Sequence, residues 1–247
     1  MEQGTRTRSD RSEAINSSLL HLGGGVATIG VAGDAAVELV PSSLLTLIRS
    51  APLSRIRIVE GTPEDLLEKL SLGDIDVAVG PRLATEPCQE IAREDLGSEP
   101  FHVVARPRHP VFRRGELEWH HLVGYRWILW PRHTRMRAAL ESTLEAQGLD
   151  KPVSALESDS IASTIALINR TNLLGVVPNR TARRFSRLET LRIVPLRIVE
   201  SDTTTLYWRA NRKQPTVVAL ALDCIRAFVD HSGRGSESVG TGSVALL

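Results

Sequence analysis

The chain has 247 residues, 42% of them hydrophobic, and its 30 Lys and Arg against 29 Asp and Glu give a formal net charge of +1. This length can bury one large core or two cores of about 100 residues each. Because the charge is nearly balanced, it provides no broad basic field for a phosphate backbone. We therefore do not expect this chain by itself to bind nucleic acid.

Membrane and export signals are not evident either. No stretch approaches the roughly 18 apolar residues of a membrane-spanning helix, and residues 1–18 lack the apolar segment of an export signal. Cys88 and Cys224 lie far apart and form no C-x-x-C pair, so we expect two reduced, buried thiols. These features predict a cytoplasmic protein with no membrane segment.

The first part of the chain alternates apolar strands with amphipathic helices. After a polar start, Ile15, Leu19 and Leu22 recur at helical spacing and predict a short helix that the glycines at 23–25 end. The elements expected next are a strand at 26–33, a helix at 39–51, a strand at 55–61, a helix at 63–72 and a strand at 75–79. This order predicts an α/β unit with a parallel sheet and right-handed crossovers.

The helix expected at 63–72 carries signals at both ends. Thr62 suits the N-cap, Pro63 suits the first helical position, and Gly73 can adopt the left-handed conformation that ends a helix. This helix therefore leads directly into a buried strand.

A second alternating set follows a strand expected at 99–110, where Pro107 and Pro110 cannot continue a sheet interior, so the chain is expected to cross to another lobe. The further elements are strands at 125–130, 152–158, 173–178 and 203–211, and helices at 134–148, 160–172, 180–189 and 215–231. The expected organisation is a start and linker remnant at 1–25, lobe I at 26–103 with 204–231, lobe II at 104–203, and a flexible tail at 232–247.

Motifs for catalysis or metal binding are missing from the sequence. The glycines at 23–25 precede a strand, whereas a phosphate cradle needs glycines between a strand and a helix, and no G-x-S-x-G elbow occurs. The adjacent His120 and His121 lack the i, i+4 spacing of metal ligands. We predict no enzyme, no catalytic residue, no metal site and no cofactor.

Other residues that could recognise a ligand have simpler structural interpretations. Four arginines of the basic helix are expected to form a solvated face, because the net charge is near neutral; they are Arg180, Arg183, Arg184 and Arg187. Three tryptophans are expected to pack in the core, namely Trp119, Trp127 and Trp208. Trp130 ends the strand expected at 125–130, next to a predicted crevice, and is a candidate ligand contact.

Four segments occur in an order and spacing that resemble the effector-binding domain of LysR-type transcriptional regulators. They are "LVPSSLLTLIRSAPLSRIRIVEG" at 39–61, "LSLGDIDVAVG" at 70–80, "VVARPRHP" at 103–110 and "INRTNLLGVVP" at 168–178. The similarity extends over about residues 14–228. The segments "DVAVGPRL", "VARPRHP" and "LYWRAN" are most similar to the subgroup that senses sugars or aromatic acids in bacterial catabolism.

The resemblance implies an α/β fold of two Rossmann-like lobes joined by two crossing strands, similar to type II periplasmic binding proteins, with an effector in the crevice between the lobes. It implies a homodimer or homotetramer, in which a helix at 42–50 with Leu44, Leu45, Leu47 and Ile48 packs against the edge of the second sheet. It also implies that promoter DNA is bound only through an N-terminal winged helix-turn-helix that this sequence lacks.

Ligands of open α/β sheets bind where strands end and helices begin. The candidate ligand-binding residues at such junctions are Asp34, Ala35, Thr62, Pro63, Arg82, Trp130, Pro131, Arg132, Ser158 and Ser160. Thr62 matches the family's ligand-contacting hydroxyl, although N-capping alone would also explain it. Arg82 and Arg132 can bind a carboxylate or form an ion pair that closes the lobes. Asp34 stands where many relatives carry Ser or Thr. An acid there disfavours a carboxylate ligand and favours a hydroxyl-rich or cationic group, or it simply caps its helix.

The sequence therefore predicts a sensing domain for a small-molecule effector that is a sugar, a sugar acid or an aromatic acid. Two alternatives remain open at this stage. One is a solute-binding protein of the same fold, and the other is an α/β enzyme.

Overall fold

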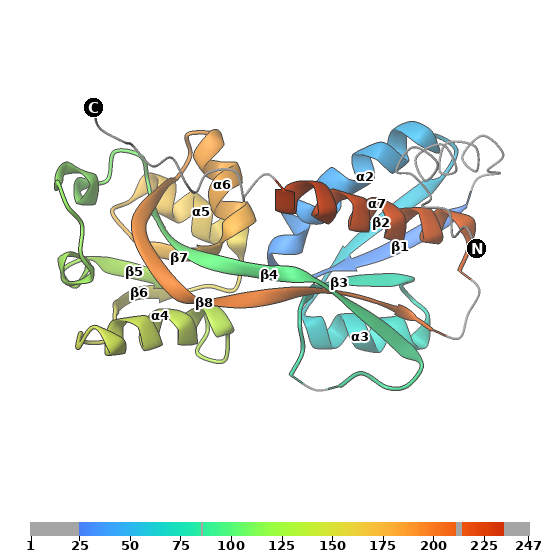
Figure 1. Cartoon of the computed structure of the whole chain (residues 1–247), viewed down its shortest axis with the longest axis horizontal. Helices are drawn as coiled ribbons and strands as arrows, with labels where there is room; N and C mark the ends of the chain where they lie inside the picture. The colour runs from blue at the N-terminus through green and yellow to red at the C-terminus, as the bar shows by residue number, and fades with distance from the viewer. Residues whose placement is uncertain (1–24, 85, 211–213, 235–247) are drawn as a thin grey trace, which may run out of the picture. The chain divides into compact units, whose positions relative to one another are not determined.

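The computed structural model describes residues 25–84, 86–210 and 214–234, which divide into two compact units (Figure 1). Unit 1 takes its described residues from Met1–Val79, Leu83–Leu96 and Leu206–Leu247, and unit 2 comprises Gly80–Arg82 and Gly97–Thr205. The helix expected before the glycines at 23–25 and most of the expected tail lie outside the described residues.

Unit 1 contains the parallel sheet that the sequence predicts. Its elements begin with strand β1 (Val26–Val31), the 3₁₀ helix η1 (Gly33–Ala36), helix α2 (Leu39–Ser50), strand β2 (Arg55–Glu60), helix α3 (Pro63–Leu72) and strand β3 (Val77–Pro81). Strand β1 lies between β2 and β3 and pairs with both of them in parallel. The predicted strand–helix order of this region is confirmed.

Helix α3 begins and ends where its sequence signals indicate. The Thr62 hydroxyl accepts a hydrogen bond from the Asp65 N–H at 3.2 Å, and Gly73 adopts a φ of 89° after the last turn. The Arg209 guanidinium donates to the Leu70 carbonyl at 3.0 Å, which satisfies one of the last carbonyl groups of the helix. The predicted caps are therefore confirmed.

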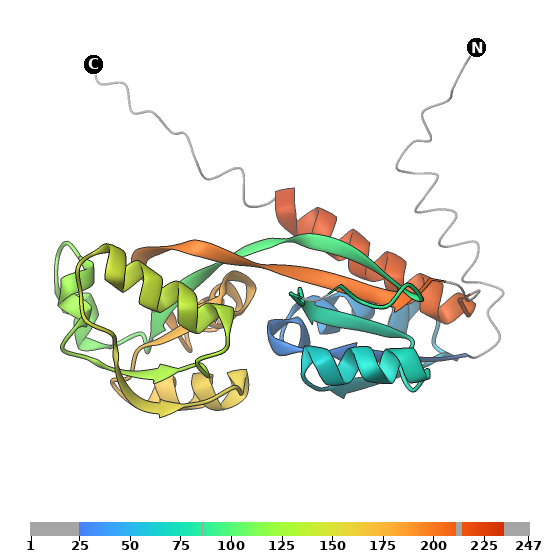
Figure 2. The same cartoon turned by 90° about the horizontal axis from the view of Figure 1, so that it is seen from below.

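Helices cover both faces of the unit 1 sheet. Helix α7 (Thr216–Arg234) packs beside α2, and Figure 2 shows α3 on the opposite side of the sheet from α7. Side chains of α7, including Val217, Val218 and Ile225, are fully or almost fully buried in the same core as Ile29 and Leu44. Because α7 continues to Arg234, the first three residues of the expected flexible tail are helical instead.

Unit 2 is built from a second alternating set of elements. They are the 3₁₀ helices η2 (Pro110–Arg113) and η3 (Trp119–Leu122), strands β5 (Arg126–Leu129), β6 (Val153–Glu157) and β7 (Gly175–Pro178), and helices α4 (Arg135–Ala146), α5 (Ile161–Arg170) and α6 (Asn179–Arg187). Helices α4 and α5 lie on opposite sides of these strands (Figure 1). Trp127, Phe101 and Leu140 are buried in the unit 2 core, which confirms that Trp127 packs rather than binds a ligand.

Two long strands contribute residues to both units. Strand β4 (Ile91–Ala105) begins eight residues before the strand expected at 99–110, and β8 (Arg192–Arg209) is one continuous strand. The exposed or half-buried residues Ala92–Asp95 and Val199–Asp202 interrupt the apolar pattern, so the sequence did not indicate these extensions. The sheet order is β2-β1-β3-β8-β4-β7, with β5 and β6 in a second sheet.

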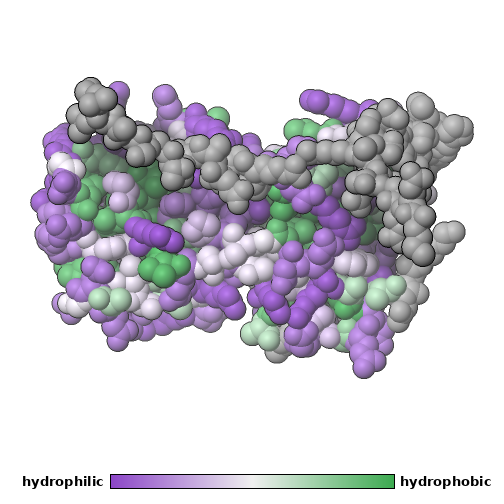
Figure 3. All heavy atoms as spheres, in the orientation of Figure 1, coloured by the Kyte–Doolittle hydropathy of each residue, from purple (hydrophilic) through white to green (hydrophobic). Residues whose placement is uncertain are grey.

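The surface is mixed in polarity. Within the described part of the chain, no helix is long and apolar enough to cross a bilayer. Hydrophilic residues are spread over both units in the view of Figure 3, interrupted by smaller apolar patches. Cys88 is exposed and Cys224 is half-buried, which corrects the expectation of two buried thiols.

A histidine in the unit 2 core is held in its neutral form. His109 is 1% exposed, and its Nδ1 accepts a hydrogen bond from the Val111 N–H at 3.1 Å. Its Nε2 must therefore carry the proton that is donated to the Asn172 carbonyl at 3.1 Å. Burial lowers the pKa of His109, and the nearby Arg106 charge also lowers it, against the opposing effect of the Asn172 hydrogen bond.

We expect the free energy of unfolding to decrease as the pH falls below about 6.5. The folded-state pKa of His109 lies below the unfolded value, so in that window the unfolded state binds more protons, and the stability present at higher pH is lost on acidification. The pKa of His102 is lowered in the same direction, chiefly by burial. Each histidine lowers the free energy of unfolding by at most about 1.4 kcal/mol per pH unit.

Urea unfolding between about pH 7.5 and 5 measures this loss, and NMR titration of the histidine ring protons measures each pKa directly. His133 is exposed, so His133→Gln serves as the control for the effect of replacing a histidine. A His109 ring that titrates at or above about 6.5 would contradict the expectation.

Candidate functional site

In unit 1, the ends of two parallel strands bring four candidate residues to one edge of the sheet. Val31 pairs with Glu60, and the Gly61 N–H donates to the Val31 carbonyl at 3.3 Å. The loop after β1 and the loop after β2 therefore lie side by side. They carry Asp34 and Ala35, and Thr62 and Pro63, respectively.

These four residues differ in what they can offer a ligand. Thr62 is exposed at the start of α3, and its hydroxyl hydrogen remains available because the oxygen acts only as acceptor for the Asp65 N–H. Asp34 is buried within η1. Ala35 is 0% exposed and packs in the core of unit 1, so it supports the loop instead of presenting a side chain to a ligand.

In unit 2, the same strand-end geometry gathers a second group of candidates. Strands β5 and β6 are parallel with Leu129 paired to Glu157, and the Ser158 N–H donates to the Leu129 carbonyl at 2.9 Å. The loop after β5 contains Trp130, Pro131 and Arg132. The loop after β6 contains Ser158 and Ser160 and leads into α5.

The turn that carries Arg132 is held by hydrogen bonds from the next helix. The Thr134 hydroxyl donates to the Pro131 carbonyl at 2.7 Å and also caps α4 by accepting from the Arg137 N–H at 3.4 Å. Arg132 itself is exposed, and among the described residues no hydrogen bond or ion pair engages its guanidinium. This arrangement presents a cation on a fixed turn at the strand-end edge.

The remaining unit 2 candidates already form hydrogen bonds within the protein. Trp130 is buried, and its indole N–H donates to the Val176 carbonyl at 2.8 Å. Ser160 caps α5 by accepting from the Ser163 N–H at 3.3 Å, while the Ser158 hydroxyl oxygen accepts from the Ser160 N–H at 3.1 Å. Arg82 follows β3, and its N–H donates to the Thr203 carbonyl at 2.8 Å.

Two residues near these loops were not identified from the sequence. Thr164 is 1% exposed in α5, and its hydroxyl has no hydrogen-bond partner among the described residues. A polar residue on the apolar face formed by Ile161, Ile165 and Ile168 was the signal that could have revealed it.

The second residue is Arg137, which is buried in α4 and donates to the Trp130 carbonyl at 3.4 Å and to Glu157 at 3.5 Å. It thereby ties the ends of β5 and β6 together. Its close contact with Glu141 helps, after the Lys151 hydrogen bond, to lower the pKa of that carboxyl group. Because Glu141 is only four residues away, the sequence pattern of the two residues is that of an ordinary ion pair on a helix surface.

The basic helix α6 requires one correction. Arg180 does not belong to a solvated face: its guanidinium contacts the Glu99 carboxylate, which also accepts from the Arg180 N–H at 3.1 Å. Glu99 is buried and Arg180 is largely buried, with side-chain exposed fractions of 7% and 14%. Arg183 and Arg187 remain exposed as predicted.

No cluster of three or more metal-ligating side chains occurs within residues 25–84, 86–210 and 214–234. The adjacent histidines His120 and His121 both contact Glu118. The His121 Nδ1 accepts a hydrogen bond from the Glu118 N–H at 3.0 Å, and His120 contacts the Glu118 carboxylate at 3.1 Å. Both histidines therefore have local structural roles.

Two α/β units that share two long strands, each with loops gathered at the ends of its parallel strands, define a ligand-binding domain of the type II periplasmic-binding-protein class. The chain matches the family model described as LysR substrate binding domain over residues 21–230. It therefore belongs to this family, the effector-binding domains of LysR-type transcriptional regulators, which are regulatory domains and not enzymes. The enzyme alternative is thereby excluded, and the predicted family and fold class are confirmed.

Curated relatives of the chain are transcriptional regulators. It is 28% identical over 225 residues to the HTH-type transcriptional regulator GbpR of Azospirillum brasilense, covering 90% of this chain and 65% of that protein. It is 24% identical over 199 residues to the regulator PcaQ of Agrobacterium fabrum, covering 80% of this chain and 64% of PcaQ. The chain thus spans slightly less than two thirds of the length of these relatives.

Solved structures show the same fold at low sequence identity. The BenM effector-binding domain with its effector benzoate matches with a TM-score of 0.63 at 19% identity, covering 85% of this chain and 94% of that one. The effector-binding domain of QuiR in complex with shikimate matches at 0.64 and 13%, covering 85% and 99%. Full-length CbnR complexed with target DNA matches at 0.65 and 18%, covering 90% and 75%.

Proposed function

We propose that this domain senses a small hydroxylated or carboxylated organic effector through the strand-end loops of both units, and that binding regulates transcription. The observation that supports the proposal is the arrangement of the strand-end loops within each unit, considered separately. Neighbouring parallel strands bring the Thr62 hydroxyl to one loop edge in unit 1 and the Arg132 guanidinium to one in unit 2.

The chemistry of these loops narrows the effector class. Arg132 can form a forked pair with a carboxylate, and Thr62 and Ser158 can bind hydroxyl groups. Asp34 disfavours a second carboxylate near the unit 1 loop but accepts hydrogen bonds from hydroxyl groups. The benzoate and shikimate bound by the structural neighbours are both small carboxylates, which supports this choice. A sugar acid combines the two features best, ahead of a neutral sugar or an aromatic acid.

A thermal-shift screen of sugars, sugar acids and aromatic acids identifies the effector, because a ligand at 100 times its Kd stabilises the fold by about 2.7 kcal/mol. A sugar acid is expected to give the largest increase in Tm. Release of a transformed product would contradict a sensor, and genomic sequence encoding an export signal directly upstream would favour the solute-binding alternative.

Calorimetry with substituted proteins then tests the contacts. Thr62→Val should weaken binding by about 0.5–1.5 kcal/mol, and Arg132→Ala by about 1.5–3 kcal/mol, since charged hydrogen bonds are stronger. Thr46→Val on α2 and Arg170→Ala on α5 are matched controls, because both residues are exposed away from the strand-end loops. Unchanged affinity in both test variants would place the site elsewhere.

We propose further that the regulator containing this domain acts in the cytoplasm and contacts promoter DNA through a separate winged helix-turn-helix. The DNA complex of full-length CbnR supports this division of roles. The purified 247-residue chain should therefore give no sequence-specific mobility shift at physiological salt.

Self-association is the third part of the proposal. The expected dimer helix presents Leu45 and Ile48 to solvent, with exposed fractions of 52% and 56%, whereas Leu44 and Leu47 are buried in the unit 1 core. Only Leu45 and Ile48 can therefore form an interface, so two of the four predicted interface residues remain. We propose that this face packs against a sheet edge of unit 2 in a second copy, such as β6 with its exposed Val153.

A further inference from the structure

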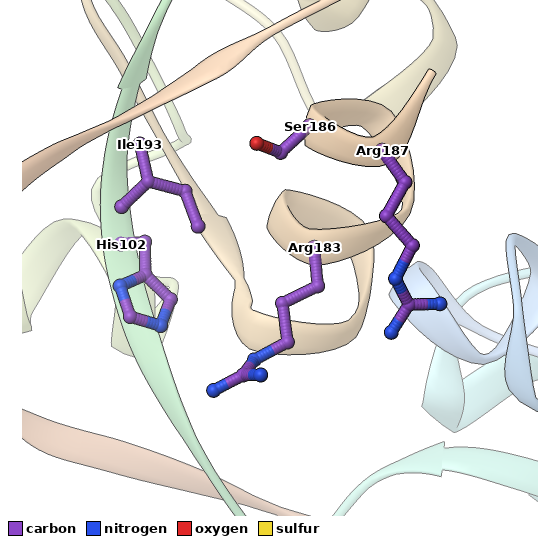
Figure 4. Close-up of a pocket in the computed structure, with 5 residues that line it drawn as sticks. All are labelled: His102, Arg183, Ser186, Arg187 and Ile193. Atoms are coloured by element: carbon purple, nitrogen blue, oxygen red, sulfur yellow. The ribbon is translucent and has the colours of Figure 1, made fainter. Parts of the chain in front are cut away.

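A cavity on unit 2 lies between helix α6 and strands β4 and β8 (Figure 4), and none of the strand-end residues assigned to the effector lines it. Its volume is about 370 Å³, and it is lined by His102, Arg183, Ser186, Arg187 and Ile193. This volume falls within the range of small-molecule sites. A second cavity of about 380 Å³ shares His102 and Ile193 and adds residues of the two strands, including Pro100, Pro195 and Leu196.

One face of α6 supplies the polar wall of the first cavity. Arg183, Ser186 and Arg187 are spaced i, i+3 and i+4, so they lie on the same side of the helix. The buried Thr181 and Ala182 anchor the helix on its other side. In Figure 4, the Ser186 hydroxyl and the Arg183 side chain extend from α6 toward the side of His102 and Ile193, and Arg187 runs alongside.

Asn179 fixes the orientation of two lining groups. Its Oδ1 accepts from Arg183 Nε at 2.8 Å and lies 3.1 Å from His102 Nε2. A guanidinium can only donate, so this amide atom must be the oxygen, and His102 Nε2 must carry a proton. Because Nε is engaged by Asn179, the terminal Nη groups of Arg183 are the ones left for a ligand.

The charge of the lining is positive. Burial lowers the pKa of His102, and the neighbouring Arg183 charge also lowers it, against the Asn179 hydrogen bond, so the ring is neutral at pH 7. No carboxylate lines this cavity, and the nearby acid Glu99 is already bound by Arg180. Arg183 and Arg187 therefore present two positive charges, and among the described residues no carboxylate pairs with either of them.

We propose that this cavity is a second ligand site, which binds a small organic dianion. Two guanidinium groups and a hydroxyl match either a dicarboxylate or a phosphate monoester, because both anions accept forked pairs of hydrogen bonds. Ile193 and the adjoining apolar strand residues would contact the carbon skeleton of the ligand. None of the residues assigned to the effector lines this cavity, so the proposal does not depend on the effector proposal.

Calorimetry on the 247-residue chain tests the site with three probes at constant ionic strength: inorganic phosphate, succinate and acetate. Saturable binding of phosphate or succinate, at least about tenfold tighter than acetate, is expected because only a dianion engages both arginines. Phosphate selectivity would identify the phosphate ester class and succinate selectivity the dicarboxylate class. Equal binding of all three probes, or no saturable binding, would overturn the proposal.

Matched substitutions on α6 locate the binding. Arg187→Gln should weaken dianion binding at least about tenfold, and Arg183→Gln should do the same with additional loss of the Asn179 contact. Arg184→Gln changes the same charge on the same helix but does not line the cavity, so its affinity should match that of the unsubstituted chain. Equal losses of dianion affinity in Arg184→Gln and Arg187→Gln would show a non-specific effect of the helix charge and would refute a defined binding site.

Two further readouts separate a local effect from misfolding and from the effector site. The Tm of Arg187→Gln without ligand should equal that of the unsubstituted chain, since Arg187 is exposed. The His102 ring signals should shift in NMR spectra as the dianion is added, and those of the exposed His133 should not. Arg132→Ala should leave dianion binding unchanged, and a loss there would mean that the probe occupies the strand-end loops instead.

Discussion

Replacing Glu99 with alanine is expected to lower the free energy of unfolding by about 3–5 kcal/mol, because it leaves the guanidinium of Arg180 buried without its partner. The two side chains are 7% and 14% exposed, so water cannot replace the lost contact efficiently. The substitution also removes the acceptor of the Arg180 N–H in the first turn of α6. Urea unfolding monitored by far-UV circular dichroism measures the change.

We expect the charged pair itself to contribute little net stability compared with apolar residues of similar volume, because both charges must be removed from water. Burial raises the pKa of Glu99 despite the opposing charge and hydrogen bonds of Arg180, which agrees with this expectation. The double variant Glu99→Leu with Arg180→Met should therefore be much more stable than Glu99→Ala. A loss below about 1 kcal/mol in Glu99→Ala would show that Arg180 finds another partner or reaches water.

Replacing Leu45 and Ile48 with glutamate is expected to weaken self-association at least a hundredfold. Burying one such side chain contributes about 1.5–3 kcal/mol, and in a two-fold dimer both residues act twice. A hundredfold change in Kd corresponds to about 2.7 kcal/mol, which is less than the sum for four side chains. Sedimentation velocity over a concentration series measures the Kd.

Helix α3 provides the control for this substitution. Leu72 is 71% exposed, and α3 covers the opposite face of the unit 1 sheet from α7. Leu72→Glu should therefore leave the Kd unchanged. A chain that is already monomeric at high micromolar concentration, or a double variant that associates as before, would refute an interface on α2.

The sequence was sufficient to predict local structure where end signals and apolar periodicity agree. Helix α3 begins after Thr62 and ends before Gly73, as predicted, because each of these residues satisfies backbone groups that a helix end leaves unpaired. The sequence did not predict the extensions of β4 and β8. Their polar stretches are stabilised by pairing with neighbouring strands, and the strand propensity of the individual residues does not include this pairing.

The candidate site was predictable to the level of loops but not of side chains. Strand-end loops of a parallel sheet must meet at one edge, and the pairs Val31–Glu60 and Leu129–Glu157 confirm that they do. Whether a residue there faces solvent depends on packing, which buries Ala35 in the unit 1 core and ties Trp130 to Val176. Arg180 differs from Arg183 only because folding brings it to Glu99, 81 residues away in sequence.

The division of the chain has a consequence for its synthesis on the ribosome. Apart from Gly80–Arg82, unit 2 is one uninterrupted stretch that ends at Thr205, whereas unit 1 needs both the first strands and the last helix. Val217, Val218 and Ile225 of α7 complete the core that β1 and α2 begin, so the first segment to emerge from the tunnel must wait for the final one. Unit 2, although it is encoded in the middle, can thus mature first, reversing the usual N-to-C order of nascent folding.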